Sequence, residues 1–170
     1  MFSQDFKELL SAFNEHRVKY LIVGGYAVAV HAQPRATKDL DLFIEPSPEN
    51  AKAVFAALAK FGAALADLRP EDLTNPDIFF RMGTPPQMVE ILPRISGVEF
   101  DQAWEHRIEA VIDERTGLKA FVISADDLIA NKTAFGRPYD LADVDAIHKA
   151  QESQRPAAKK KPPEPSGPNQ

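Results

Sequence analysis

The chain has 170 residues, enough for one compact domain with a sizeable apolar core but too few for two independent domains of ordinary size. It contains no cysteine, which excludes disulfides, thiolate metal sites and cysteine nucleophiles and leaves oxygen ligands and histidine for any metal chemistry. The formal net charge is −5; residues 154–170 carry four cations and one carboxylate, so the preceding residues carry −8, which disfavours non-specific binding of nucleic acid.

The first part of the chain predicts two helices and two strands. Ser3 is a potential helix cap, and the apolar residues after it recur at helical spacing. The continuous apolar run Tyr-Leu-Ile-Val is typical of a strand buried on both faces, and Gly24 and Gly25 end it. Pro34 disfavours helical geometry in the residue before it. The predicted elements are a helix over residues 4–16, a strand over 20–23, a short helix over 26–31 and a strand over 40–45.

The middle of the chain predicts two more helices and four strands. An alanine-rich helical segment opens at Pro48, and Gly62 is placed to end it. Residues 83–86, Gly-Thr-Pro-Pro, have the composition of a turn between two apolar runs, and Thr116-Gly117 separates two others. The predicted elements are a helix over residues 48–61, strands over 78–82 and 88–92, a short helix over 100–105, and a hairpin of strands over 108–112 and 118–122.

The last part of the chain predicts a helical segment followed by a tail. Ser124 is a potential cap for a helix that runs to about residue 135, and a further helix is predicted over 140–151. Proline, lysine and small residues replace aliphatic ones from 153 onward, so residues 153–170 are predicted to be disordered. No segment approaches the roughly 20 apolar residues of a membrane helix. We therefore expect a cytoplasmic protein that does not bind a membrane.

Two aspartates mark the start of the strand predicted over residues 40–45. Asp39 and Asp41 are two residues apart, so in a strand both carboxylates point to the same face, with about 6 to 7 Å between their Cα atoms. Such a pair of hard oxygen ligands suits Mg²⁺, which binds one or two carboxylates together with substrate phosphates. The alternative is a solvent-exposed turn, the commoner role of an isolated Asp-x-Asp.

The glycine pair lies between a predicted strand and a predicted helix. Because Gly24 and Gly25 have no side chains, backbone amides and the positive end of the helix could approach a phosphate there. The alternative is a tight turn that is needed only for packing. Glu90 lies in an apolar strand and either faces water or acts as a third metal ligand. Together, the glycines and carboxylates predict a phosphate site that faces a metal site.

These motifs resemble those of the DNA-polymerase-β-like nucleotidyltransferase superfamily. The resemblance rests on residues 24–27, Gly-Gly-Tyr-Ala, and on residues 35–42, Arg-Ala-Thr-Lys-Asp-Leu-Asp-Leu. Within that superfamily the chain resembles the bacterial AbiEii-like, toxin-type nucleotidyltransferases, including a branch with Asp-Leu-Ile-x-Asn-Lys and Gly-Arg-Pro-x-Asp-Leu-Ala-Asp-Val, which residues 127–144 match. The likeness spans about residues 18–150.

The resemblance implies a role for each matching residue. Asp39, Asp41 and Glu90 would bind Mg²⁺ or Mn²⁺, and Glu90, where many relatives have aspartate, would help to deprotonate the attacking hydroxyl. Lys132 would neutralise phosphate charge in the transition state; its alternative is a surface lysine. The remaining predicted nucleotide-binding residues are Gly24, Gly25, Arg35, Thr37, Lys38, Asp140 and Asp143. For Asp140 and Asp143, a purely structural ion pair with Lys132 or Arg137 is an equal alternative. For Arg35 and Lys38, the alternative is a position in an exposed basic loop.

The resemblance also implies a fold and a function. The fold class is α/β (α+β): a nucleotidyltransferase core over residues 1–123 with a mixed β-sheet flanked by helices, plus a small C-terminal helical segment over 124–152 packed on the core. The function is metal-dependent transfer of a nucleoside monophosphate from a nucleoside triphosphate such as ATP to an acceptor hydroxyl, the EC 2.7.7 type of reaction. A toxin-like role would add a tRNA acceptor and an antitoxin partner. The alternatives are a small-molecule, antibiotic-type nucleotidyltransferase and a catalytically silent protein-binding module.

Overall fold

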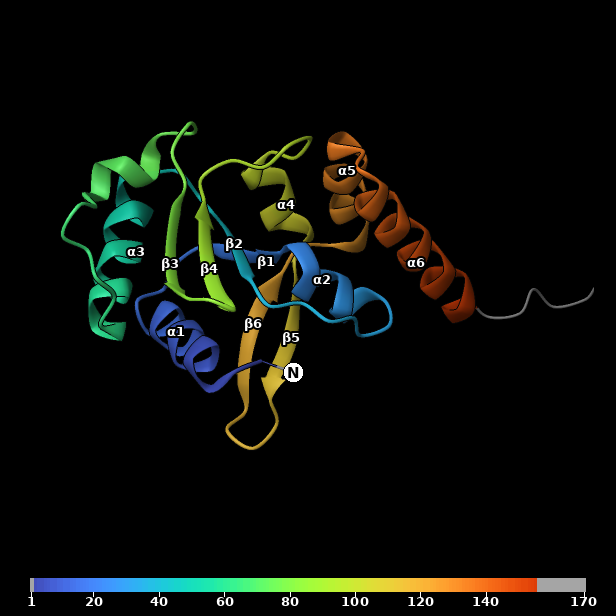
Figure 1. Ribbon diagram of the computed structural model, residues 1–170, viewed down its shortest axis with the longest axis horizontal. Coiled ribbons are helices and arrows are strands. Elements are labelled where there is room, and N and C mark those ends of the chain that lie inside the picture. Colours follow the sequence, from blue (N-terminus) through green and yellow to red (C-terminus); the bar gives the residue numbers. More distant parts are fainter. Residues whose placement is uncertain (1, 156–170) are drawn as a thin grey trace, which may run out of the picture.

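The computed structural model describes residues 2–155 and shows helices around a mixed sheet (Figure 1). Its elements are, in chain order, α1 (Gln4–Glu15), β1 (Tyr20–Val23), α2 (Gly24–His31), β2 (Leu40–Ile44), α3 (Pro48–Phe61), the 3-10 helix η1 (Pro70–Thr74), β3 (Phe80–Thr84), β4 (Gln87–Leu92), α4 (Phe100–His106), β5 (Ile108–Asp113), β6 (Leu118–Val122), α5 (Ala125–Phe135) and α6 (Pro138–Gln154). The predicted α/β (α+β) fold, a mixed sheet flanked by helices, is confirmed.

The sheet has its most apolar strands at its centre. The strand order is β3-β4-β2-β1-β6-β5, with β2 parallel to β4, β1 parallel to β6, and the other neighbours antiparallel. All four residues of β1 are buried, as the continuous apolar run predicts for a strand covered on both faces. None of the five residues of β3 is buried, consistent with its place at the edge of the sheet.

Helices cover both faces of the sheet. Phe13 of α1 packs edge-on against Tyr20 of β1, whereas Phe100 of α4 packs edge-on against Phe43 of β2. Phe43 pairs with Leu21, the neighbour of Tyr20, and neighbouring residues of a strand point to opposite faces. The helices α1 and α4 therefore lie on opposite faces of the sheet.

The helix ends form where the sequence predicts them. The backbone N–H of Phe6 donates to Ser3 Oγ at 3.3 Å, and that of Asp127 donates to Ser124 Oγ at 3.1 Å. Gly62 follows α3 with a φ of 89°, in the left-handed region that glycine adopts readily. These three residues fix the start of α1, the start of α5 and the end of α3 as predicted.

Two predicted boundaries near the cleft described below are wrong. The second helix begins at Gly24, not at residue 26, so the glycine pair is the first turn of α2 and not a separate turn before it. The edge strand begins at Phe80 and not at residue 78, because Phe80 is the first residue paired with β4. Ile78 and Phe79 lie outside the sheet and are exposed.

The C-terminal helices pack on each other and on α2 (Figure 1). The last helix begins at Pro138 and ends at Gln154, so it is longer at both ends than the predicted 140–151. The predicted tail boundary at residue 153 is therefore too early; residues 156–170 of that tail lie outside the described residues. Between residues 2 and 155, no helix combines the length and the apolar character needed to cross a membrane.

Candidate functional site

An open cleft of about 670 Å³ lies between one end of the sheet and helices α5 and α6. Its walls come from strand ends, from the loop after α2 and from the two C-terminal helices. Ten of the predicted site residues line it: Gly24, Gly25, Arg35, Thr37, Lys38, Asp39, Asp41, Glu90, Lys132 and Asp140. The remaining one, Asp143, does not line the cleft but contacts two residues that do, Arg35 and Lys132.

The strand register brings the acidic residues side by side. Val23 pairs with Asp41, Asp41 pairs with Glu90, and Glu90 pairs with Arg81, so these four residues form one row across β1, β2, β4 and β3. Directly paired residues point to the same face of a sheet, and neighbouring strands are about 4.8 Å apart. Asp41 is two residues before Phe43, so the row lies on the face that α4 covers further along the strands.

The carboxylates of this row repel one another. Burial, together with the charges of Glu90 and Asp39, raises the pKa of Asp41 to about 7, and Lys132 and Arg81 oppose the rise only in part. Asp39 immediately precedes β2, and its effect on Asp41 places it within electrostatic range. The sheet side of the cleft therefore carries an excess of negative charge.

Sequence reasoning missed one residue of this row, Arg81. Its Nε lies 3.3 Å from Glu90 Oε1 and its Nη2 lies 3.8 Å from Asp39 Oδ2. Among residues 2–155, no three carboxylates or imidazoles are gathered in the arrangement of a metal site; metal binding by Asp39, Asp41 and Glu90 stays a prediction. The predicted hairpin places Arg81 on the strand next to that of Glu90, but it does not determine which residues of the two strands pair.

The glycine pair is required by close approaches within the chain. Gly24 has a φ of 63°, and a Cβ atom there would collide with the carboxylate of Asp41. A Cβ atom on Gly25 would lie 2.5 Å from Thr37 Oγ1, closer than real Cβ atoms approach an oxygen. Val23, at the N-cap of α2, provides no side-chain hydrogen bond to the first turn. The packing role of the two glycines is therefore supported, because a side chain at either position would collide with a neighbour. The phosphate-binding role also keeps support, because no side chain caps the first backbone N–H groups of α2.

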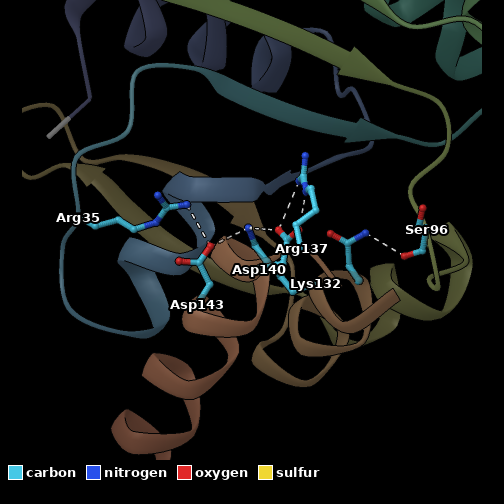
Figure 2. Close-up of polar contacts among 7 residues, drawn as sticks. Arg35, Ser96, Lys132, Arg137, Asp140 and Asp143 are labelled. Carbon is cyan, nitrogen blue, oxygen red and sulfur yellow. Dashed lines mark hydrogen bonds and ion pairs between the residues drawn. The ribbon is translucent and has the colours of Figure 1, made fainter. Parts of the chain in front are cut away.

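The helical side of the cleft carries a chain of ion pairs (Figure 2). Lys132 Nζ lies 2.8 Å from Asp143 Oδ2 and 3.3 Å from Asp140 Oδ1. Arg35 Nη2 contacts Asp143 Oδ2 at 3.0 Å, and Arg137 Nε contacts Asp140 Oδ2 at 2.7 Å. Lys132, Asp140 and Asp143 are only 7%, 2% and 6% exposed. The predicted ion pairing of the two aspartates with Lys132 and Arg137 is confirmed, and a surface position for Lys132 is wrong.

Each carboxylate in this chain of ion pairs has two cationic partners. Burial alone would raise the pKa of Asp140, but hydrogen bonds from Arg137 and Lys132 outweigh it and hold the pKa below its ordinary value. Beside them, Asn131 Nδ2 donates to the backbone oxygen of Ser96 at 2.8 Å and ties α5 to the loop after β4 (Figure 2). The ammonium group of Lys132 is thus held in a fixed position at the cleft.

Comparison with known proteins identifies a family for the chain. A protein-family model described as "Nucleotidyltransferase of unknown function (DUF6036)" matches residues 2–152. No curated protein matches the chain. The match covers both the sheet with its carboxylates and the helices with Lys132. It does not identify the AbiEii-like branch, which stays a prediction from residues 127–144.

Proposed function

Because the chain belongs to the DUF6036 family of nucleotidyltransferases, we propose that it transfers a nucleoside monophosphate from a nucleoside triphosphate to an acceptor hydroxyl in a metal-dependent reaction. In this reaction the acceptor oxygen forms a bond to the α-phosphorus, the bond to pyrophosphate breaks, and the hydroxyl loses its proton. The observation that carries the proposal is a single cleft in which three mutually repelling carboxylates face a fixed lysine.

The acidic residues fit a divalent cation. Asp39, Asp41 and Glu90 offer only hard oxygen donors, which Mg²⁺ and Mn²⁺ prefer. Burial and the charges of Glu90 and Asp39 raise the pKa of Asp41, and a bound cation would relieve the part that is due to these charges. When bound there, the ion would neutralise charge on the phosphates and favour ionisation of the attacking hydroxyl.

The other cleft residues would bind and orient the substrates. The first backbone N–H groups of α2, at Gly24 and Gly25, would donate to the triphosphate, as helix N-termini do for anions. Lys132 would meet the same phosphates from the opposite side, and its ion pairs hold the ammonium in place before substrate binds. Arg35 and Lys38 would extend this basic contact along the loop. Glu90, beside Asp41, would accept the proton of the hydroxyl.

The identities of the donor, the acceptor and the partner protein are further parts of the proposal. ATP is one candidate donor, and a tRNA 3′ end as the acceptor and an antitoxin as the partner rest on the likeness to toxin-type relatives. A small hydroxylated molecule is the alternative acceptor, because antibiotic-modifying relatives resemble the same glycine and aspartate motifs. The retained carboxylates and the buried, paired Lys132 favour an enzyme over a silent binding module.

A transfer assay tests the proposal. The purified protein is incubated with each labelled nucleoside triphosphate, Mg²⁺, and either total RNA or a set of small hydroxylated compounds. We expect label to enter an acceptor, with transfer reduced about a thousandfold or more in Asp41→Asn. Asp77→Asn is the matched control, because Asp77 lines the same cleft but pairs with Arg94, away from the acidic row.

Two results would contradict the proposal in different ways. Transfer that survives in Asp41→Asn would exclude the assigned role of the carboxylate row. No transfer to any acceptor, together with no triphosphate binding in calorimetry, would instead support the silent binding module.

A further inference from the structure

Arg81 holds the position between two of the three carboxylates proposed to bind metal. It lies on the edge strand β3, directly opposite Glu90, and its guanidinium group contacts both Glu90 and Asp39. Asp39 immediately precedes β2 and Glu90 lies within β4, so one arginine joins the start of β2 to the middle of β4. No described residue apart from Arg81 forms an ion pair with Asp39 or Glu90.

A guanidinium group and a divalent cation compete for the same oxygen atoms. Carboxylates that form ion pairs with an arginine are partly neutralised by its charge. Mg²⁺ needs the same oxygens at short distance and in near-octahedral geometry. A metal ion bound by Asp39 and Glu90 would lie beside the guanidinium group and be repelled by its charge, so we expect the arginine contacts to break when metal binds.

The side chain of Arg81 can move away from Asp39 and Glu90. The side chain of Arg81 is 49% exposed, and β3 has a neighbour on one side only, so the guanidinium group can turn into solvent without disturbing the core. Ion pairs with this degree of exposure contribute little, about 0.2–1 kcal/mol in general. Two of them, together with a local positive charge, are enough to weaken metal binding without abolishing it.

We propose that Arg81 is a positioning residue that occupies the cation space between Asp39 and Glu90 in the metal-free protein and must be displaced when a divalent ion binds. This inference rests on the proposed function, because it assigns the carboxylates to a metal. On this proposal, metal binding is coupled to a rotation of the Arg81 side chain away from the two carboxylates. Arg81 thereby lowers the affinity for metal and keeps Asp39 and Glu90 paired when no metal is present.

Metal affinity in the absence of substrate is the test. Mn²⁺ binding is measured by calorimetry and by the electron paramagnetic resonance of the free ion, in wild type, Arg81→Gln, Arg81→Lys and Arg94→Gln. Arg94→Gln is the matched control, since Arg94 lines the same cleft and its loss changes the net charge equally, but it pairs with Asp77 and not with the acidic row. We expect Arg81→Gln to bind Mn²⁺ about tenfold more tightly than wild type, Arg81→Lys to lie between them, and Arg94→Gln to differ less than about twofold.

The possible results separate the inference from the proposed function. Equal or weaker binding by Arg81→Gln, with measurable binding by wild type, would overturn the role of Arg81 and leave the metal site intact. Tightening of equal size in Arg94→Gln would also overturn it, because it would reduce the effect to net charge. Binding of Mn²⁺ by Arg81→Gln alone supports the inference. No binding by any of the four proteins would overturn the metal site and the inference together.

Discussion

The two walls of the cleft hold their charges in opposite ways. On the sheet wall, Asp39, Asp41 and Glu90 repel one another, and burial and this repulsion raise the pKa of Asp41 to about 7. On the helical wall, Lys132 is buried between Asp140 and Asp143, each of which has an arginine as a further partner. Both carboxylates of the helical wall have two cationic partners each, whereas the sheet wall has three carboxylates and one arginine, Arg81.

This difference predicts that the two walls contribute differently to stability and to activity. Removing one partner of a buried ion pair leaves an uncompensated charge and destabilises the fold. Residues of a repelling cluster destabilise the fold and are retained for what they bind. Substitutions on the sheet wall should therefore reduce activity without loss of stability, and substitutions on the helical wall should reduce both.

The largest effect is expected for Glu90→Gln, which removes a carboxylate of the sheet wall while keeping its shape. We expect the transfer rate to fall about a thousandfold, because both a metal ligand and the proposed base are lost. The free energy of unfolding should stay within about 1 kcal/mol of wild type, since only the exposed pair with Arg81 is broken. Initial rates and urea unfolding measure the two quantities. Glu109→Gln, in the β5–β6 hairpin, is the control that should change neither; a large loss of stability in Glu90→Gln would break the comparison.

The next effect is expected on the helical wall, for Lys132→Met. Removal of the ammonium group leaves Asp140 and Asp143 with only their outer arginine partners. Because two buried carboxylates lose their shared cation, we expect a loss of about 2–4 kcal/mol of unfolding free energy, measured in urea. Lys38→Met, at an exposed position of the same cleft, should change stability by less than about 0.5 kcal/mol. Equal stabilities of the two variants would show that the helical wall is not structural.

A smaller effect is expected from pH. The pKa of Asp41 is raised from 3.8 to about 7, so its contribution to stability is fully present below pH 3.8 and is lost as the pH rises toward 7. We expect Asp41→Asn to gain about 1–2 kcal/mol of unfolding free energy over wild type between pH 4 and pH 8, less than the roughly 4 kcal/mol that the full shift allows. Thermal unfolding at both pH values measures this. Saturating Mg²⁺ should cancel the difference at pH 8, and a gap that is independent of pH would contradict the repulsion.

The smallest effect is expected at the outer end of the helical wall, for Arg35→Gln. Arg35 is half exposed and contacts Asp143 at 3.0 Å, so its loss should cost about 0.5–1 kcal/mol of unfolding free energy. Because Arg35 also lines the cleft, we expect the KM for the triphosphate to rise roughly tenfold while kcat changes less. Steady-state kinetics distinguish the two parameters. A fall in kcat alone would show that Arg35 acts only by orienting Lys132.

The elements that local sequence determines were predictable, and long-range pairing was not. Ser3, Gly62 and Ser124 mark helix ends through contacts within a few residues, and these ends are confirmed. Arg81 was missed because the register of a hairpin depends on the length of its loop, and the loop has two residues, not four. A slip of this size in the loop changes the residue that faces Glu90.

The site itself was partly predictable for the same reason. The acidic and glycine motifs are short and adjacent in sequence, and their residues line one cleft. The bond from Arg35 to Asp143 joins positions 108 residues apart, and only the packing of α6 on α2 brings them together. The sequence likewise indicated an ion pair for Lys132, but not that this lysine is buried.

The order of the two walls along the chain has a consequence during synthesis on the ribosome. All three carboxylates of the sheet wall are translated by residue 90, whereas Lys132, Asp140 and Asp143 follow only after β6. A growing chain that has reached the end of the sheet holds its acidic row without the opposing lysine. The cleft is therefore completed only when α6 has emerged and packed, which ties assembly of the site to nearly complete translation of the described fold.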